Sequence, residues 1–199
     1  AVRKGLVLAF ASVLGTADAK AAFLEKASKS LDFPADKAEI LLRLAEVLYG
    51  AGSYEKAAGF FAEAASAAGA PPQAKAAALA GLASCRGKTG RTDEALKAYG
   101  SIIEQFPSSE QCPDALLQSS IILLNKKDGA AAENLLRKLA ADFKDSPLRP
   151  YAIFYLGYIK FASGSRGDAE KLFLEVLKTE GVDPALESDT RLYLAWSFI

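Results

Sequence analysis

Few residues of this 199-residue chain have the types and spacing that catalysis or metal binding requires. The sequence contains two cysteines, Cys85 and Cys112, and no histidine. Without histidine, the chain cannot form a Ser–His–Asp triad, a histidine general base or a His-ligated zinc or iron site. Neither cysteine belongs to a C-x-x-C motif, which disfavours thiol catalysis and metal binding. We therefore expect two free, partly buried thiols.

One stretch resembles a phosphate-binding loop at its end, where Gly87 is followed by Lys88 and Thr89. Its earlier glycine, Gly81, lies six residues before Gly87 instead of five, and the stretch falls in a predicted helix rather than after a strand. We interpret it as a helix end followed by a polar turn. Carboxylates at predicted helix starts and on exposed faces are explained by capping and solvation; they are Glu46, Glu55, Asp93 and Glu94.

The composition excludes several classes of function. The 24 basic residues are balanced by 24 acidic ones, so the chain lacks the positive charge on which binding to nucleic acids or anionic membranes depends. No apolar run reaches the roughly 18 residues needed to span a bilayer. Methionine is absent, and residues 196–199 end within an apolar helical pattern. This favours a processed product or a piece of a longer chain.

An internal repeat positions the remaining residues. Alanine follows a polar turn at positions 57, 95, 132 and 169, which are 38, 37 and 37 residues apart. A large apolar residue comes four places after each alanine; these residues are Phe61, Tyr99, Leu136 and Phe173. Apolar residues at helical spacing precede each turn, so every repeat is predicted to contain two helices. Ser146–Pro147 and Asp183–Pro184 place proline at predicted first helical positions.

The small residues have a physical role in this interpretation. Two helices approach to about 8–10 Å only where small side chains lie at their crossing point. The large residue one turn later then fills the wedge between this helix pair and the next. Because one pair cannot bury both of its faces, the repeats must stack on one another.

This pattern resembles the tetratricopeptide repeat. In that family a leucine and a small residue occupy positions 7 and 8, as in Leu44–Ala45, Leu82–Ala83 and Leu156–Gly157. Glycine near position 15 matches Gly52, Gly90 and Gly164, and the alanines and aromatic residues above match positions 20 and 24. The third repeat departs, with Lys127 in place of the glycine and Leu136 in place of the aromatic residue.

The resemblance implies an all-α, TPR-like right-handed superhelix of stacked antiparallel helix hairpins, with 1–199 forming a single solenoid. The predicted repeats are 36–72, 73–109, 110–146 and 147–183, followed by a lone helix over 184–199. Residues 1–35 are interpreted as a degenerate first repeat or N-terminal helices. The alternative for residues 1–19 is a secretory signal, with Ala17–Ala19 as its cleavage site. In this register about 15 Å separate Cys85 and Cys112 along the helix axes, too far for a disulfide.

The family also implies a binding groove, lined by positions 2, 5, 9 and 12 of each first helix. Most of these positions are small or acidic in the first two repeats, where Leu42 and Tyr49 are the exceptions, and most are apolar or aromatic in the last two. The predicted partner-binding residues are Leu117, Ile121, Leu124, Tyr151, Phe154, Tyr158 and Phe161. The alternative for the aromatic stripe is packing against adjacent helices. Position 9 lacks the residues that clamp acidic C-terminal tails, so binding of such tails is disfavoured.

We therefore predict a non-catalytic interaction scaffold that needs no cofactor and binds a peptide, a helix, an assembly subunit or a second copy of itself. The alternative is a helical accessory region of a larger enzyme or secretion machine. A small-ligand site among the aromatic residues is a third interpretation. The chain resembles the TPR-like repeats of bacterial cell-envelope lipoproteins and Tol-Pal-associated proteins in its long repeat period and in the segments 105–109 and 142–147. This resemblance favours a periplasmic or envelope location.

Overall fold

The computed structural model describes residues 2–30 and 34–198. Within these residues it contains eleven α-helices and no strand, so the predicted all-α fold class of stacked helix hairpins is confirmed. The chain divides into two compact units, Ala1–Cys112 and Pro113–Ile199, called unit 1 and unit 2 below. The predicted end segments, 1–35 and 184–199, include residues outside the description, namely 1, 31–33 and 199.

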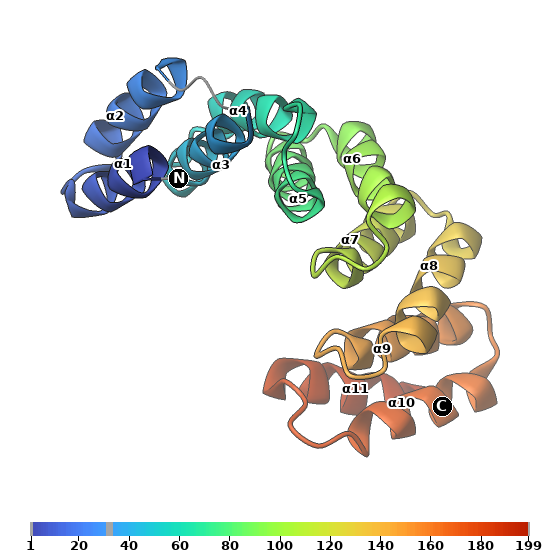
Figure 1. Cartoon of the computed structure of the whole chain (residues 1–199). Coiled ribbons are helices and arrows are strands. Elements are labelled where there is room, and N and C mark those ends of the chain that lie inside the picture. Colours follow the sequence, from blue (N-terminus) through green and yellow to red (C-terminus); the bar gives the residue numbers. More distant parts are fainter. Residues whose placement is uncertain (1, 31–33, 199) are drawn as a thin grey trace. The chain divides into compact units, whose positions relative to one another are not determined.

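Unit 1 is a row of helix pairs in which each helix lies beside the next one along the chain (Figure 1). Its helices are α1 (Val2–Val13), α2 (Ala17–Lys29), α3 (Pro34–Gly50), α4 (Tyr54–Ser66), α5 (Pro72–Lys88) and α6 (Thr92–Gln105). Leu24 and Ala27 of α2 form a core cluster with Ile40 and Leu44 of α3. The segment considered as a secretory signal forms α1 and the start of α2, and Ala11 of α1 joins the same cluster.

Unit 2 begins within the first turn of α7 (Cys112–Asn125) and continues the helix pairs. Its other helices are α8 (Gly129–Asp142), α9 (Arg149–Ala162), α10 (Arg166–Leu177) and α11 (Pro184–Ser197). Asp183 caps α11 by accepting a hydrogen bond from the Ala185 amide at 2.7 Å, with proline at the predicted first position. Pro147 does not start α9, because the Ser146 hydroxyl accepts the Leu148 amide and holds a turn there.

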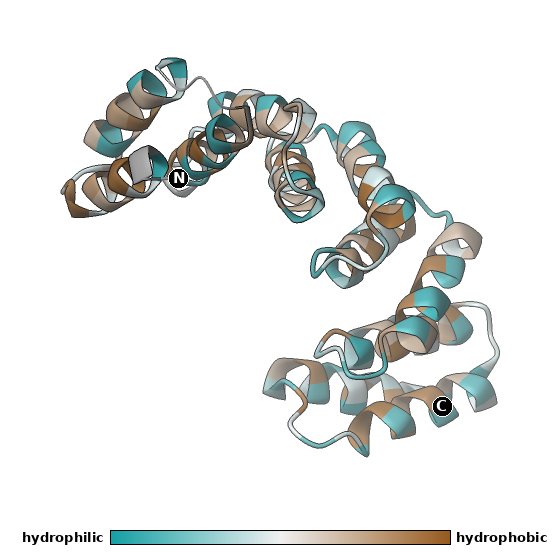
Figure 2. Cartoon of the chain, viewed as in Figure 1, coloured by the Kyte–Doolittle hydropathy of each residue, from teal (hydrophilic) through white to brown (hydrophobic). Residues whose placement is uncertain are grey.

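The repeated alanines lie where the predicted crossing points require small residues. Ala57, Ala95, Ala132 and Ala169 are fully buried. The large residues four positions later are buried as well; they are Phe61, Tyr99, Leu136 and Phe173. Figure 2 shows hydrophobic residues alternating with hydrophilic ones along the helices, as expected when one face of each helix is packed and the other solvated.

Two glycines let the aromatic rings approach the facing helix directly. A Cβ atom added to Gly157 of α9 would lie only 2.6 Å from Cε1 of Phe173, which belongs to α10. A Cβ atom added to Gly81 of α5 would likewise overlap the ring of Phe61 on α4. Each ring therefore occupies the space that the side chain of any residue other than glycine would fill at that position.

The turns inside the helix pairs share one backbone conformation. Gly52, Gly90 and Gly164 have φ values of 75°, 76° and 80°, in the left-handed region that favours glycine. Lys127 takes the equivalent place with φ 63°. The amide of each residue and of the next one bonds back to carbonyls of the preceding helix, the arrangement of a Schellman motif. The third repeat thus keeps the turn although it lacks the glycine.

We expect Lys127→Gly to raise the free energy of unfolding by about 0.5–1 kcal/mol, because it removes the cost of a left-handed non-glycine residue. The reciprocal change in the same unit, Gly164→Lys, should lower it by about 1 kcal/mol. Urea denaturation of both variants measures the two effects. A destabilised Lys127→Gly protein would contradict this account of the turn.

We expect Gly81→Ala to destabilise unit 1 by about 1–3 kcal/mol, because the new methyl group overlaps the Phe61 ring. The matched control is Gly59→Ala in α4, where an added Cβ meets open space. That change should stabilise the chain by about 0.5–1 kcal/mol through helix propensity. Thermal melts of the two variants should shift in opposite directions, and a shared direction would contradict the proposed close approach.

Candidate partner-binding surface

Four of the seven predicted partner-binding residues line one hollow of unit 2. Ile121 and Leu124 come from α7, and Phe154 and Tyr158 come from α9. The hollow has a volume of about 450 Å³ and is completed by α11. Its remaining lining residues are Asn125, Tyr155, Asp189, Leu192, Tyr193 and Trp196. We refer to these ten residues as the aromatic hollow.

Tyr193 of α11 is the central ring of this surface. Its centroid lies 5.5 Å from that of Tyr158, 5.7 Å from Phe154, 5.8 Å from Phe161 and 5.2 Å from Trp196. All four pairs are edge-to-face, which is a preferred geometry for aromatic side chains. The aromatic stripe of α9 therefore packs in part against a helix of its own chain, which was the alternative interpretation of that stripe.

The individual residues of the stripe differ in what remains accessible. Phe154 is 7% exposed and belongs to the core cluster with Phe173. Tyr158 is half-buried and faces the hollow with one part of its ring free. Phe161 is also half-buried but lies against Tyr193, outside the lining.

Two predicted residues lie away from the aromatic hollow. Leu117 of α7 is only 4% exposed. Tyr151, at the start of α9, lines a separate hollow of about 690 Å³ formed by the loops before α9 and α11. The Tyr151 hydroxyl bonds to Asp183, the residue that caps α11. That bond, after the Ala185 amide, lowers the pKa of Asp183. The structure thus places Tyr151 at the junction between α9 and α11.

The α11 contribution was missed when the groove was predicted from the first helices of complete repeats. A signal was present, because Asp189, Tyr193 and Trp196 are spaced four and three residues apart and so share one helix face. On this face Leu192 and Trp196 are 47% and 44% exposed. Large apolar side chains exposed around a hollow are typical of interaction surfaces.

Two tyrosines of the hollow, Tyr155 and Tyr193, have raised pKa values. Burial raises the pKa of Tyr155, and the charge of Asp189 raises it further. Burial, with Tyr158 and Asp189 as smaller contributions, raises the pKa of Tyr193. Both hydroxyl groups therefore remain protonated at neutral pH and can donate hydrogen bonds.

Lys160 of α9 is neutralised by the neighbouring helix α8. Its ammonium group donates to Oε1 of Glu133 on α8 at 2.8 Å. Glu133 also accepts from Arg137, and the two partners lower its pKa. This half-buried ion pair joins α8 to α9 on the side opposite the hollow residue Tyr158, which lies two positions earlier in α9.

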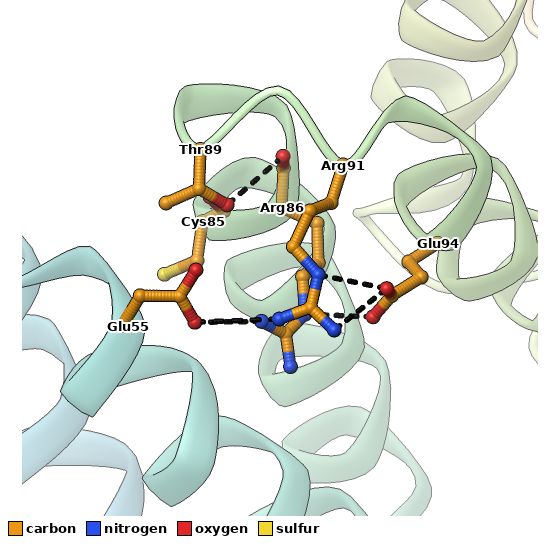
Figure 3. Close-up of polar contacts among 6 residues, drawn as sticks. All are labelled: Glu55, Cys85, Arg86, Thr89, Arg91 and Glu94. Atoms are coloured by element: carbon orange, nitrogen blue, oxygen red, sulfur yellow. Dashed lines mark hydrogen bonds and ion pairs between the residues drawn. The ribbon is translucent and has the colours of Figure 1, made fainter.

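Two of the unit 1 carboxylates considered above, Glu55 and Glu94, are bound to arginines (Figure 3). Arg86 of α5 donates to Glu55 of α4 at 2.9 Å and lies 3.2 Å from Glu94 of α6. Arg91 contacts the same two carboxylates at 3.4 and 2.7 Å. This network of alternating charges connects three consecutive helices, and its carboxylates serve as structural partners.

The remaining chemical candidates are structural. Gly81–Lys88 lies inside α5, and Thr89 ends that helix by donating to the Cys85 carbonyl, so no phosphate loop forms there. Both cysteines are buried and neither forms a disulfide, and burial raises the pKa of Cys85 to about 11. In residues 2–30 and 34–198 no three His, Cys, Asp or Glu side chains are grouped as a metal ion would require.

No helix among the described residues has the length and apolarity to cross a membrane.

The groove positions of unit 1 offer less apolar surface. Tyr49 packs against Tyr54 at 5.2 Å, and Glu39 is bound by Lys4 of α1 at 2.7 Å. Lys4 also lies 3.5 Å from Asp36, so part of the acidic character predicted for this region is neutralised within the chain.

Two family models match the chain, and both are described as tetratricopeptide repeat. They cover residues 6–75 and 77–109, together just over half of the sequence. The chain belongs to the tetratricopeptide repeat family. Repeats of this family are generally protein–protein interaction modules and typically act as non-catalytic scaffolds. Among curated proteins, none matches this chain.

Solved structures support the same fold. A tetratricopeptide repeat protein from Parabacteroides merdae aligns over 100% of this chain and 74% of its own, with a TM-score of 0.77 and 15% identity. BtubC from P. vanneervenii aligns over 90% of this chain and 81% of its own, with a TM-score of 0.69 and 18% identity. MamA aligns over 89% and 92%, with a TM-score of 0.66 and 19% identity. At these identities the likeness concerns the tetratricopeptide fold alone.

We expect Cys85 to resist alkylation in the folded repeat protein, because its thiol is buried and its pKa is about 11. Iodoacetamide at pH 7.5 should modify it about two orders of magnitude more slowly than in urea, where the thiol regains its ordinary pKa. A Cys112→Ala variant isolates the Cys85 signal, which mass spectrometry follows. Equal rates in the two conditions would contradict the assignment of Cys85 as a structural thiol.

Proposed function

We propose that this chain is a non-catalytic scaffold and that the aromatic hollow of unit 2 binds an apolar segment of a protein partner. The observation that carries the proposal is the exposure of Leu192 and Trp196 beside the half-buried Tyr158 and Tyr193. An isolated soluble unit gains nothing from leaving such side chains in water. A peptide, a helix or an assembly subunit seated on them would bury this surface.

The hollow is suited to a side chain from an extended or helical partner. Its walls are rings already fixed by edge-to-face contacts, so little side-chain entropy is lost when a partner binds. Aromatic residues fixed in this way commonly supply most of the binding energy of an interface. Within the predicted set, Ile121, Leu124 and Tyr158 would make direct contact, while Phe154 would support them from below.

A second candidate function is that of a helical accessory region in a larger enzyme or in a secretion or envelope machine. It is favoured by the apolar side chains exposed on α1, where Leu6, Phe10 and Val13 are 66%, 54% and 75% exposed. A larger assembly would cover them. The similarity of residues 105–109 and 142–147 to repeats of envelope lipoproteins suggests the bacterial envelope as the location of such an assembly.

Affinity capture with the native chain, followed by mass spectrometry, identifies the partner, and two variants then test the hollow. Tyr158→Ala should weaken binding by about 2 kcal/mol, roughly 30-fold, because it removes one wall of the hollow. Trp196→Ala should weaken it to a similar extent, since Trp196 is exposed at the rim. Isothermal titration with the captured partner measures both losses.

The matched control is Leu42→Ala, a half-buried groove position in α3 of unit 1. Circular dichroism first establishes that every variant is folded. We expect Leu42→Ala to leave the affinity nearly unchanged. Equal losses in unit 1 and unit 2, or a larger loss from Leu42→Ala, would disprove the assignment of the hollow.

A further inference from the structure

The aromatic hollow contains one acidic side chain, and no ion pair among the described residues balances it. Asp189 is the only acidic residue among its ten lining residues, and none of the ten is lysine or arginine. Asp189 forms no ion pair within the part of the chain that the structure describes. The one basic residue of α11, Arg191, is bound to Glu187 at 2.6 Å.

Aromatic rings line the hollow together with this carboxylate. The rings of Tyr158 and Tyr193 meet at 86°, and those of Tyr193 and Trp196 meet at 78°. All three rings line the same hollow as Asp189, and the electron-rich face of an aromatic ring attracts a guanidinium or ammonium group. The effect of Asp189 on the pKa values of Tyr155 and Tyr193 is consistent with its charge reaching into the same space.

The other kinds of occupant leave this charge unsatisfied or oppose it. An acidic side chain would be repelled by Asp189. A purely apolar side chain would remove water from the carboxylate without supplying a partner, which costs free energy. A basic side chain supplies the counter-charge and lays its methylene groups along Leu192 and Leu124.

We propose that the aromatic hollow receives an arginine or lysine side chain of a peptide partner, with Asp189 as the counter-charge and Tyr158, Tyr193 and Trp196 as the aromatic walls. This inference rests on the proposed function and specifies the chemistry of the partner. It distinguishes the hollow from a general apolar patch, because it requires a positive charge in the segment that binds.

A random 12-residue peptide library displayed on phage and selected on the full chain tests the inference. Clones that also bind the Tyr158→Ala chain are discarded, so that only hollow-dependent clones remain. We expect those clones to be enriched in arginine or lysine next to an apolar residue. Hollow-dependent clones without this enrichment, or enriched in Asp and Glu, overturn the basic-occupant inference but leave the proposed function standing. The absence of any hollow-dependent clone overturns both.

Synthetic peptides from the selection provide the quantitative test. Trp196 is the single tryptophan of the sequence, so its fluorescence reports binding at the hollow directly. Asp189→Asn should weaken the basic peptide about three- to fivefold, as expected for a charge exposed at a rim. The same substitution should not affect a peptide carrying glutamine in place of the basic residue. Equal weakening of both peptides overturns the inference.

Two controls complete the design. Asp168→Asn removes an exposed carboxylate of α10 that pairs with Lys171, and it should change neither affinity. Analytical ultracentrifugation of the chain alone tests the other occupant, a second copy of the protein. A dimer that Tyr158→Ala dissociates would place that copy in the hollow and overturn the inference, whereas a monomer supports it.

Discussion

The contact between small residues on one helix and large rings on the next is the constraint on which the helix stacking depends. Buried alanines at the crossing points allow the helices of a pair to come together, and Gly81 and Gly157 admit the rings of Phe61 and Phe173. In unit 2 the packing of the Phe173 ring against Gly157 holds α10 against α9 and so orients the aromatic face of α9. The surface that we assign to a partner is a consequence of that packing.

The sequence was sufficient to predict the helix pairs, because the crossing alanines and the large residues after them recur at a nearly constant period. The sequence was a poorer guide where a residue adopts a backbone conformation, or a position relative to a helix, that its residue type does not usually take. Lys127 adopts the left-handed turn without being glycine, since the Schellman hydrogen bonds on either side impose that conformation. Pro147 precedes its helix by two residues because Ser146 holds an intervening turn.

The hollow could be predicted only in part, for a related reason. Repeat positions identified its α7 and α9 walls, including Ile121 and Tyr158, because those helices belong to complete pairs. The α11 wall has no second helix in the sequence to give it a register, so Tyr193 and Asp189 were not assigned. The repeat pattern also does not show which groove residues are buried or bonded within the chain. Leu117 is buried, and the Tyr151 hydroxyl bonds to Asp183, so neither side chain faces the hollow.

The separation in sequence between Tyr193 and the rings that it contacts has a consequence for synthesis of the protein. Its ring covers Phe154, Phe161 and Phe173, which leave the ribosome about 20 to 40 residues earlier. At 5–20 residues per second, these rings stay uncovered for about 1–8 s during translation. The nascent α9–α10 hairpin therefore lacks this aromatic cover until α11 has been synthesised.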